Sequence, residues 1–152
     1  FTLSLSQRLN EISEVEVKEA QEGDILKNGA VYIAPGGKHM RVVKKGTDYC
    51  IKLSDEPAID GLRPCANVMY ESLENCQYDE ITCVVLTGMG ADGTKGIQGL
   101  AAHHKKLHVI AQDADTCVVY GMPKAIAQTG LVDEVVPLGS VAETITKNVG
   151  VS

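Results

Sequence analysis

The sequence reads Thr87-Gly88-Met89-Gly90-Ala91-Asp92-Gly93 directly after the apolar run Ile81-Thr82-Cys83-Val84-Val85-Leu86. A run of six residues that is rich in β-branched side chains predicts a strand buried on both faces. Ile97 and Leu100, at helical spacing, predict that a helix follows the glycines. This order of elements gathers unpaired backbone N–H groups and the positive end of a helix dipole beside one carboxylate, that of Asp92.

The residues alone leave three interpretations of this turn open. In the first, Asp92 only caps its helix and contributes ~1 kcal/mol to stability. In the second, Asp92 orients a histidine, and the backbone N–H groups of Met89 and Gly90 face a developing oxyanion. The carboxyl ends of parallel strands are where α/β proteins place their chemistry, which suits this second interpretation.

The third interpretation is a dinucleotide-binding turn. The segment from Gly88 to Gly93 satisfies G-x-G-x-x-G after a strand and before a helix, and Asp113 lies 20 positions beyond Gly93. The position of Asp92 counts against this interpretation, because a carboxylate inside the phosphate-binding turn opposes the pyrophosphate. Two like charges ~4 Å apart repel by ~1–4 kcal/mol, depending on the local dielectric.

Length and composition exclude several classes of protein. The 152 residues suffice for one domain with its own core, and 44% hydrophobic with 22% charged residues argues against disorder. The net charge is −6, and the charged residues are scattered along the chain. They form no basic cluster of the kind that binds nucleic acid. No apolar run approaches the ~20 residues of a membrane helix. The five cysteines form no Cys-x-x-Cys pair, which favours buried, reduced thiols in a cytoplasmic protein.

The pattern from residue 81 onward alternates strands with helices, and it predicts a doubly wound, mainly parallel sheet in a three-layer α/β/α domain. A β-hairpin is predicted earlier, with strands at 39–43 and 49–53. The remaining predicted elements are a helix opened by a capping box at 4–7, strands at 14–19, 30–34, 107–111 and 132–136, helical segments near 68–76, 116–120 and 121–126, and a final helix opened by a capping box at 140–143.

Four motifs, in this order along the chain, resemble those of the chemotaxis protein-glutamate methylesterases, the CheB family. They are Y-I-A-P-G-G-K-H at 32–39, T-G-M-G-A-D-G at 87–93, A-Q-D at 111–113 followed by C-V-V-Y-G-M-P-K at 117–124, and the closing strand at 132–138. Because the motifs are spread over most of the chain, they form a far more specific signal than one glycine-rich turn.

The resemblance implies removal of methyl esters from glutamates on chemoreceptors, with release of methanol, by a serine nucleophile, a histidine base and an orienting aspartate. Asp92 matches that aspartate, and the turn at Met89 and Gly90 is expected to face the oxyanion. Thr116, Met122 and Pro123 are expected to border the cleft. The family implies no cofactor. Its expected partners are the cytoplasmic helices of methylated chemoreceptors and an N-terminal response-regulator domain, with no nucleic acid and no membrane insertion.

The serine and histidine segments of the family, S-T-G-G and H-M-P, are not found in residues 1–152. Phe1 and Thr2 match residues just downstream of H-M-P, and His39 belongs to a different motif. We therefore expect residues 1–152 to be the carboxyl-terminal portion of a methylesterase catalytic domain, inactive alone and with an unpaired sheet edge. The alternative is a truncated, non-catalytic module that retains the fold.

Three histidines lie close together in the sequence and are candidate metal ligands: His103, His104 and His108, of which the last two are spaced i, i+4. The segment between them contains no glutamate of the kind found in H-E-x-x-H. We therefore expect these histidines to be solvated residues at a helix end, and we expect no metal.

Overall fold

The computed structural model describes residues 1–103 and 105–150, and the chain divides into two compact units, Phe1–Cys76 and Gln77–Ser152. Across the described residues, two parallel sheets, one antiparallel hairpin and five helices form an α/β protein, as predicted. None of the helices within the described ranges is long and apolar enough to cross a membrane.

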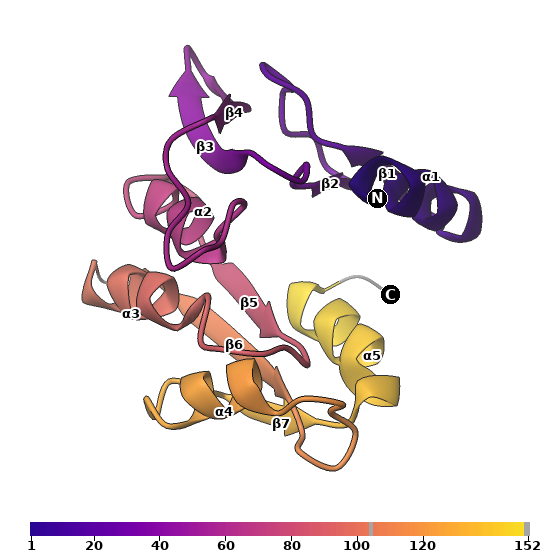
Figure 1. The fold of residues 1–152 in the computed structure, drawn as a ribbon, viewed down its shortest axis with the longest axis vertical. Helices are drawn as coiled ribbons and strands as arrows, with labels where there is room; N and C mark the ends of the chain where they lie inside the picture. The colour runs from indigo at the N-terminus through magenta and orange to yellow at the C-terminus, as the bar shows by residue number, and fades with distance from the viewer. Residues whose placement is uncertain (104, 151–152) are drawn as a thin grey trace. The chain divides into compact units, whose positions relative to one another are not determined.

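The first unit contains two two-stranded sheets and two helices (Figure 1). One sheet is a parallel pair, the other an antiparallel hairpin in which Lys45 pairs with Asp48. The predicted hairpin is thus confirmed, and it is longer at the turn than predicted. The elements are α1 (Thr2–Ile12), β1 (Glu16–Glu19), β2 (Ala30–Ile33), β3 (His39–Lys45), β4 (Asp48–Ser54) and α2 (Ala66–Ser72).

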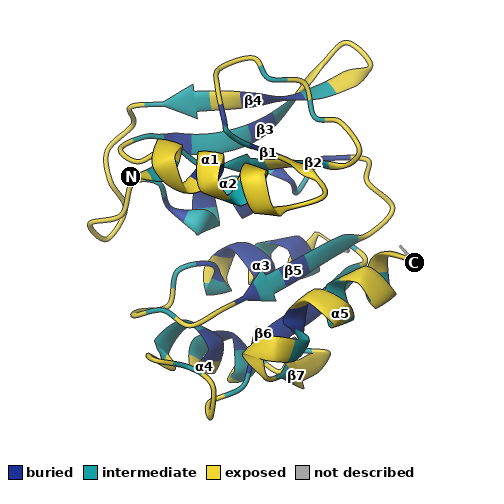
Figure 2. Ribbon diagram, turned by 90° about the vertical axis from the view of Figure 1, so that its right-hand side faces the viewer, coloured by how far each residue is buried: buried dark blue, intermediate teal, exposed yellow. Residues whose placement is uncertain are grey.

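The second unit is built on a parallel sheet with the strand order β5-β6-β7. Figures 1 and 2 show α3 and α4 on one face of this sheet and α5 on the other. The elements are β5 (Ile81–Val85), α3 (Thr94–Ala102), β6 (Leu107–Gln112), α4 (Gly121–Ala127), β7 (Glu134–Val136) and α5 (Leu138–Val149).

The core of the second unit lies around β6, the middle strand. Its last four residues are all buried, and Ile97 and Leu100 of α3 and Ile126 of α4 are fully buried as well. In β5, by contrast, Cys83 and Val85 are buried while the residues of the other face are half-buried. The prediction of burial on both faces is therefore only half right, because β5 ends the described sheet and β6 holds its centre.

Three local predictions are wrong. The helix α1 has Phe1 at its N-cap, so Ser4 lies inside the helix, and α5 begins at Leu138 with Pro137 at its N-cap, so Ser140 also lies inside. Neither helix has a side-chain hydrogen bond at its N-cap. None is required, because water can satisfy the exposed N–H groups of the first helical turn. Residues 116–120 form no helix, since side chains take the backbone groups of Thr116 that a helical ladder would use.

Candidate active-site turn

The turn after β5 is shaped by two glycines with positive φ. Gly90 has a φ of 89° and Gly93 a φ of 96°, a backbone region that side chains with a Cβ rarely adopt. Gly93 holds the N-cap position of α3, and Asp92 lies one residue before it. The half-buried Asp92 therefore stands between two left-handed residues, at the carboxyl end of a parallel strand.

A second loop, which precedes α4, fixes this turn through a dense set of hydrogen bonds. Thr87 Oγ1 donates to the Val119 carbonyl at 2.9 Å and accepts from the Val119 N–H at 2.9 Å. The Gly88 N–H donates to the same carbonyl at 3.0 Å, and the Met122 N–H donates to the Gly88 carbonyl at 2.9 Å. Two motifs about 30 residues apart in the sequence thus lie side by side.

The two loops approach so closely that neither Gly88 nor Gly121 can carry a Cβ without a shift. A Cβ on Gly88 would overlap the Met122 thioether, and one on Gly121 would lie 2.8 Å from the Gly88 carbonyl oxygen and 3.0 Å from the Gly90 nitrogen. Met122 therefore packs directly on the turn, and Pro123 beside it is fully buried at the start of α4.

The predicted oxyanion residues lie at the tip of the turn. Met89 is 86% exposed, and Gly90 is also exposed. Within the described ranges, the backbone N–H groups of Met89 and Gly90 donate no hydrogen bond to the protein. Backbone donors without a partner in the protein are what an oxyanion site requires.

The predicted cleft residue Thr116 lies in the loop after β6 and links three segments. Its N–H and Oγ1 both donate to Asp113 Oδ1, at 3.0 and 2.6 Å. Its Oγ1 accepts from the Leu138 N–H at 3.0 Å, at the start of α5. The Asp113 carboxylate is therefore engaged inside its own loop, which leaves it poorly placed for the ribose contact of a dinucleotide-binding turn.

One residue of this region lies in the A-Q-D motif but was not predicted as a site residue. Gln112, at the end of β6, is fully buried and joins Thr87 to Thr116. The available signal was a polar side chain that ends an otherwise apolar strand, because a buried amide persists only where hydrogen bonds satisfy it.

The histidine prediction holds only in part. His103 is exposed at the end of α3, as expected, and His104 lies outside the described residues. His108 is different, because it lies in β6 and its Nε2 is 2.6 Å from Glu134 Oε2, so the expectation of a solvated side chain at a helix end is wrong there. Among the residues described, no group of three or more histidine, cysteine, aspartate or glutamate side chains is arranged to hold a metal ion.

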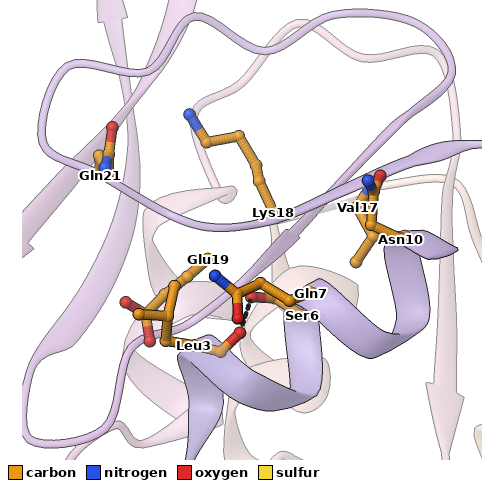
Figure 3. A pocket seen from close by; sticks show the side chains of 8 residues that line it. All are labelled: Leu3, Ser6, Gln7, Asn10, Val17, Lys18, Glu19 and Gln21. Atoms are coloured by element: carbon orange, nitrogen blue, oxygen red, sulfur yellow. Dashed lines mark hydrogen bonds between the residues drawn. The ribbon is translucent and has the colours of Figure 1, made fainter.

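A small pocket of about 200 Å³ lies elsewhere, between α1 and β1 in the first unit (Figure 3). Its groups are largely used within the protein: Ser6 Oγ donates to the Leu3 carbonyl, and Asn10 Oδ1 accepts from the Val17 N–H. It contains no residue of the turn, and we assign it no role in catalysis. The lining residues are Leu3, Ser6, Gln7, Asn10, Val17, Lys18, Glu19 and Gln21.

Comparison with known proteins identifies the family of the chain. The family model of the CheB methylesterase matches residues 1–145. The chain belongs to the CheB methylesterase family. The resemblance drawn from the four motifs is thereby confirmed.

Relatives and a solved structure agree with this assignment. A protein-glutamate methylesterase/protein-glutamine glutaminase of Desulfotalea psychrophila is 44% identical over 151 residues, which are 98% of this chain and 41% of that protein. One of the same name from Oceanobacillus iheyensis is 45% identical over 148 residues, 97% of this chain and 42% of that protein. The chain thus spans about two fifths of the length of these curated relatives.

The fold is also shared with a solved structure. The catalytic domain of the Thermotoga maritima CheB methylesterase matches with a TM-score of 0.90 and 37% identity, over 97% of this chain and 77% of that one. At this identity and coverage, the α/β architecture of the CheB methylesterase family is established for the chain.

Proposed function

We propose that residues 1–152 are the carboxyl-terminal portion of a methylesterase catalytic domain that hydrolyses glutamate methyl esters on chemoreceptors. The observation that carries the proposal is the turn itself. It holds the half-buried Asp92 beside the two exposed, unused N–H groups of Met89 and Gly90, at the carboxyl edge of a parallel sheet. Membership of the CheB methylesterase family supplies the substrate class.

In the proposed reaction, a serine oxygen attacks the ester carbonyl while a histidine takes the serine proton. Asp92 stays ionised, orients that histidine and stabilises the imidazolium. The backbone N–H of Met89, with Gly90 shaping the turn, donates to the oxyanion of the tetrahedral intermediate. Methoxide leaves with the histidine proton as methanol, and water then hydrolyses the acyl-enzyme to the glutamate carboxylate.

We propose that the serine and the histidine come from residues outside these 152, since neither S-T-G-G nor H-M-P is found among them. For the same reason, we expect residues 1–152 alone not to hydrolyse the ester. We further propose that the partners are the cytoplasmic helices of methylated chemoreceptors, and that the protein works in the cytoplasm with an N-terminal response-regulator domain. The length of the curated relatives, more than twice that of this chain, leaves room for such a domain.

Thr116, Met122 and Pro123 complete the proposed cleft. Met122 packs on the turn, and Thr116 ties the loop after β6 to the start of α5. We place these residues at the border of the cleft because the loop after β6 and the start of α4, which carry them, lie against the turn. None of them is assigned a chemical step.

The test is methanol release from methylated receptor by the complete product of the gene that encodes this chain. Asp92→Asn should lower kcat about 10⁴-fold, as expected when the carboxylate that fixes the imidazole tautomer is lost. Asp79→Asn is the matched control, because Asp79 is an exposed aspartate just before the amino end of β5. A parent protein that releases no methanol would instead favour a non-catalytic module that retains the fold. An Asp92→Asn rate equal to that of the parent would refute the role of Asp92.

A further inference from the structure

Gln112 is a fully buried polar side chain that the proposed mechanism does not use. Its Oε1 accepts a hydrogen bond from the Thr87 N–H at 2.8 Å. Its Nε2 donates to the Thr116 carbonyl at 2.8 Å and to Thr116 Oγ1 at 3.2 Å. We propose that Gln112 is a positioning residue that fixes the active-site turn, an inference that rests on the proposed function of that turn.

The orientation of the amide follows from its partners. A backbone N–H can only donate and a backbone carbonyl can only accept, so the Gln112 oxygen faces Thr87 and the nitrogen faces Thr116. The neighbours of Gln112 in β6, Ile110 and Ala111, are buried and apolar. Since a buried polar group is tolerated only when it is paired, this arrangement has one satisfied orientation.

Through these bonds the Gln112 side chain joins the loops after β5 and β6, and Thr116 extends the link to the start of α5. Thr87 belongs to the loop after β5, and Thr116 to the loop after β6. Thr116 Oγ1 in turn accepts from the Leu138 N–H after β7. In the sheet as described, β6 has a neighbouring strand on each side, so its last residue can reach both flanking loops.

The path from Gln112 to the oxyanion donor is short. The Thr87 peptide is held by Gln112, the next residue, Gly88, is held by Val119 and Met122, and Met89 follows without a bond of its own in the described ranges. If the Thr87 N–H loses its acceptor, the turn is held on one side only. A misplacement of about 1 Å in a catalytic group can lower a rate about 100-fold.

The experiment uses the complete gene product and the variant Gln112→Met, which is similar in size and makes no hydrogen bonds. We expect kcat for methanol release to fall about 10- to 100-fold with KM within twofold of the parent value, because the buried Gln112 does not reach the substrate. Hydrogen–deuterium exchange in a peptide covering residues 86–93 should become faster. A variant with lost packing alone would not speed exchange selectively in this segment.

The matched control is Thr82→Val, which removes the acceptor of the 2.6 Å hydrogen bond from Asn148 at the amino end of β5. It should keep the parent kcat and leave exchange in residues 86–93 unchanged. Where Gln112→Met does not fold, Thr116→Val serves instead. Thr116 is exposed, and the change removes the bonds of its Oγ1 with Gln112, Asp113 and Leu138. The bond from Gln112 to the Thr116 carbonyl stays, so kcat should fall by a smaller factor.

The outcomes separate the two proposals. A Gln112→Met protein with kcat within twofold of the parent overturns the positioning role, as does a Thr82→Val protein that loses as much activity. A parent protein without methanol release contradicts the proposed function, and the exchange measurement then decides the role of Gln112 by itself. Unchanged exchange in residues 86–93 would overturn that role.

Discussion

Replacing Gly121 by alanine would place a methyl group against the backbone of the turn that carries Asp92. The new Cβ would lie 2.8 Å from the Gly88 carbonyl oxygen, 3.0 Å from the Gly90 nitrogen and 3.1 Å from the Gly90 oxygen. Ordinary van der Waals contact begins at 3.4 Å, so the turn must retreat by several tenths of an ångström. All three neighbours are backbone atoms, and no side-chain rotation can relieve the overlap.

The consequences for stability and for rate differ in size. Overpacking lowers the free energy of unfolding by ~1–3 kcal/mol. Alanine has a helix propensity ~1 kcal/mol better than that of glycine, and this difference, at the start of α4, offsets part of the loss. The free energy of unfolding should thus fall by no more than ~2 kcal/mol. Removing an oxyanion donor lowers kcat by ~10²–10³-fold, and a partial displacement of Met89 should lower it by ~10–100-fold.

The assay is methanol release by the complete gene product, alongside its thermal midpoint. Gly139→Ala is the control, because it makes the same change within α5, where a Cβ would meet nothing within 4 Å. The control should keep the parent kcat. A Gly121→Ala protein that folds and shows kcat within twofold of the parent would refute the claim that close packing of the two loops sets the position of the turn.

Two further predictions concern backbone strain and pH. Gly90→Ala should lower the free energy of unfolding by ~1–2 kcal/mol, since alanine resists a φ of 89°, and should also lower kcat. Gly130→Ala, at a φ of 78° after α4, should lose similar stability in a denaturant titration but no activity, and equal kcat losses would contradict this. Burial acts to raise the pKa of Asp24, but the Gln21 N–H and the Lys18 ammonium outweigh it and hold that pKa below its ordinary value of 3.8. The ionised Asp24 therefore stabilises the fold above pH 3.8, and this contribution is lost as the pH falls through the lower folded pKa. Asp24→Asn should flatten the fall of the thermal midpoint between pH 5 and pH 2.5, and an unchanged slope would count against the prediction.

Periodicity in the sequence predicted the elements whose register is fixed by burial. The hairpin of β3 and β4 and the succession β5, α3, β6 follow from alternating or helical spacing of apolar residues. Helix starts were missed at Ser4 and Ser140, because a serine followed three residues later by glutamine or glutamate is also compatible with a helix interior. Local patterns of this kind do not say which of several adjacent residues begins a helix.

In the candidate site, too, some features could be predicted from the sequence and others could not. The turn at 87–93 was located by its own residues, since a carboxylate among glycines after a strand is a local pattern. The roles of Gln112 and Gly121 depend on contacts with Thr87, 25 residues away, and with Gly88, 33 residues away. No spacing rule encodes such contacts, so the motifs A-Q-D at 111–113 and C-V-V-Y-G-M-P-K at 117–124 mark these positions without saying which residues they contact.

The geometry also explains why the turn satisfies G-x-G-x-x-G without a nucleotide. In a dinucleotide-binding unit the glycines let the backbone approach a pyrophosphate. Here Gly88 makes room for the Met122 thioether, Gly90 adopts a left-handed conformation at the tip, and Gly93 adopts another at the N-cap of α3. Each of these three glycines is thus required by packing or by backbone conformation within the protein. The G-x-G-x-x-G pattern therefore arises here from the close packing of two segments beside a carboxylate, without a nucleotide.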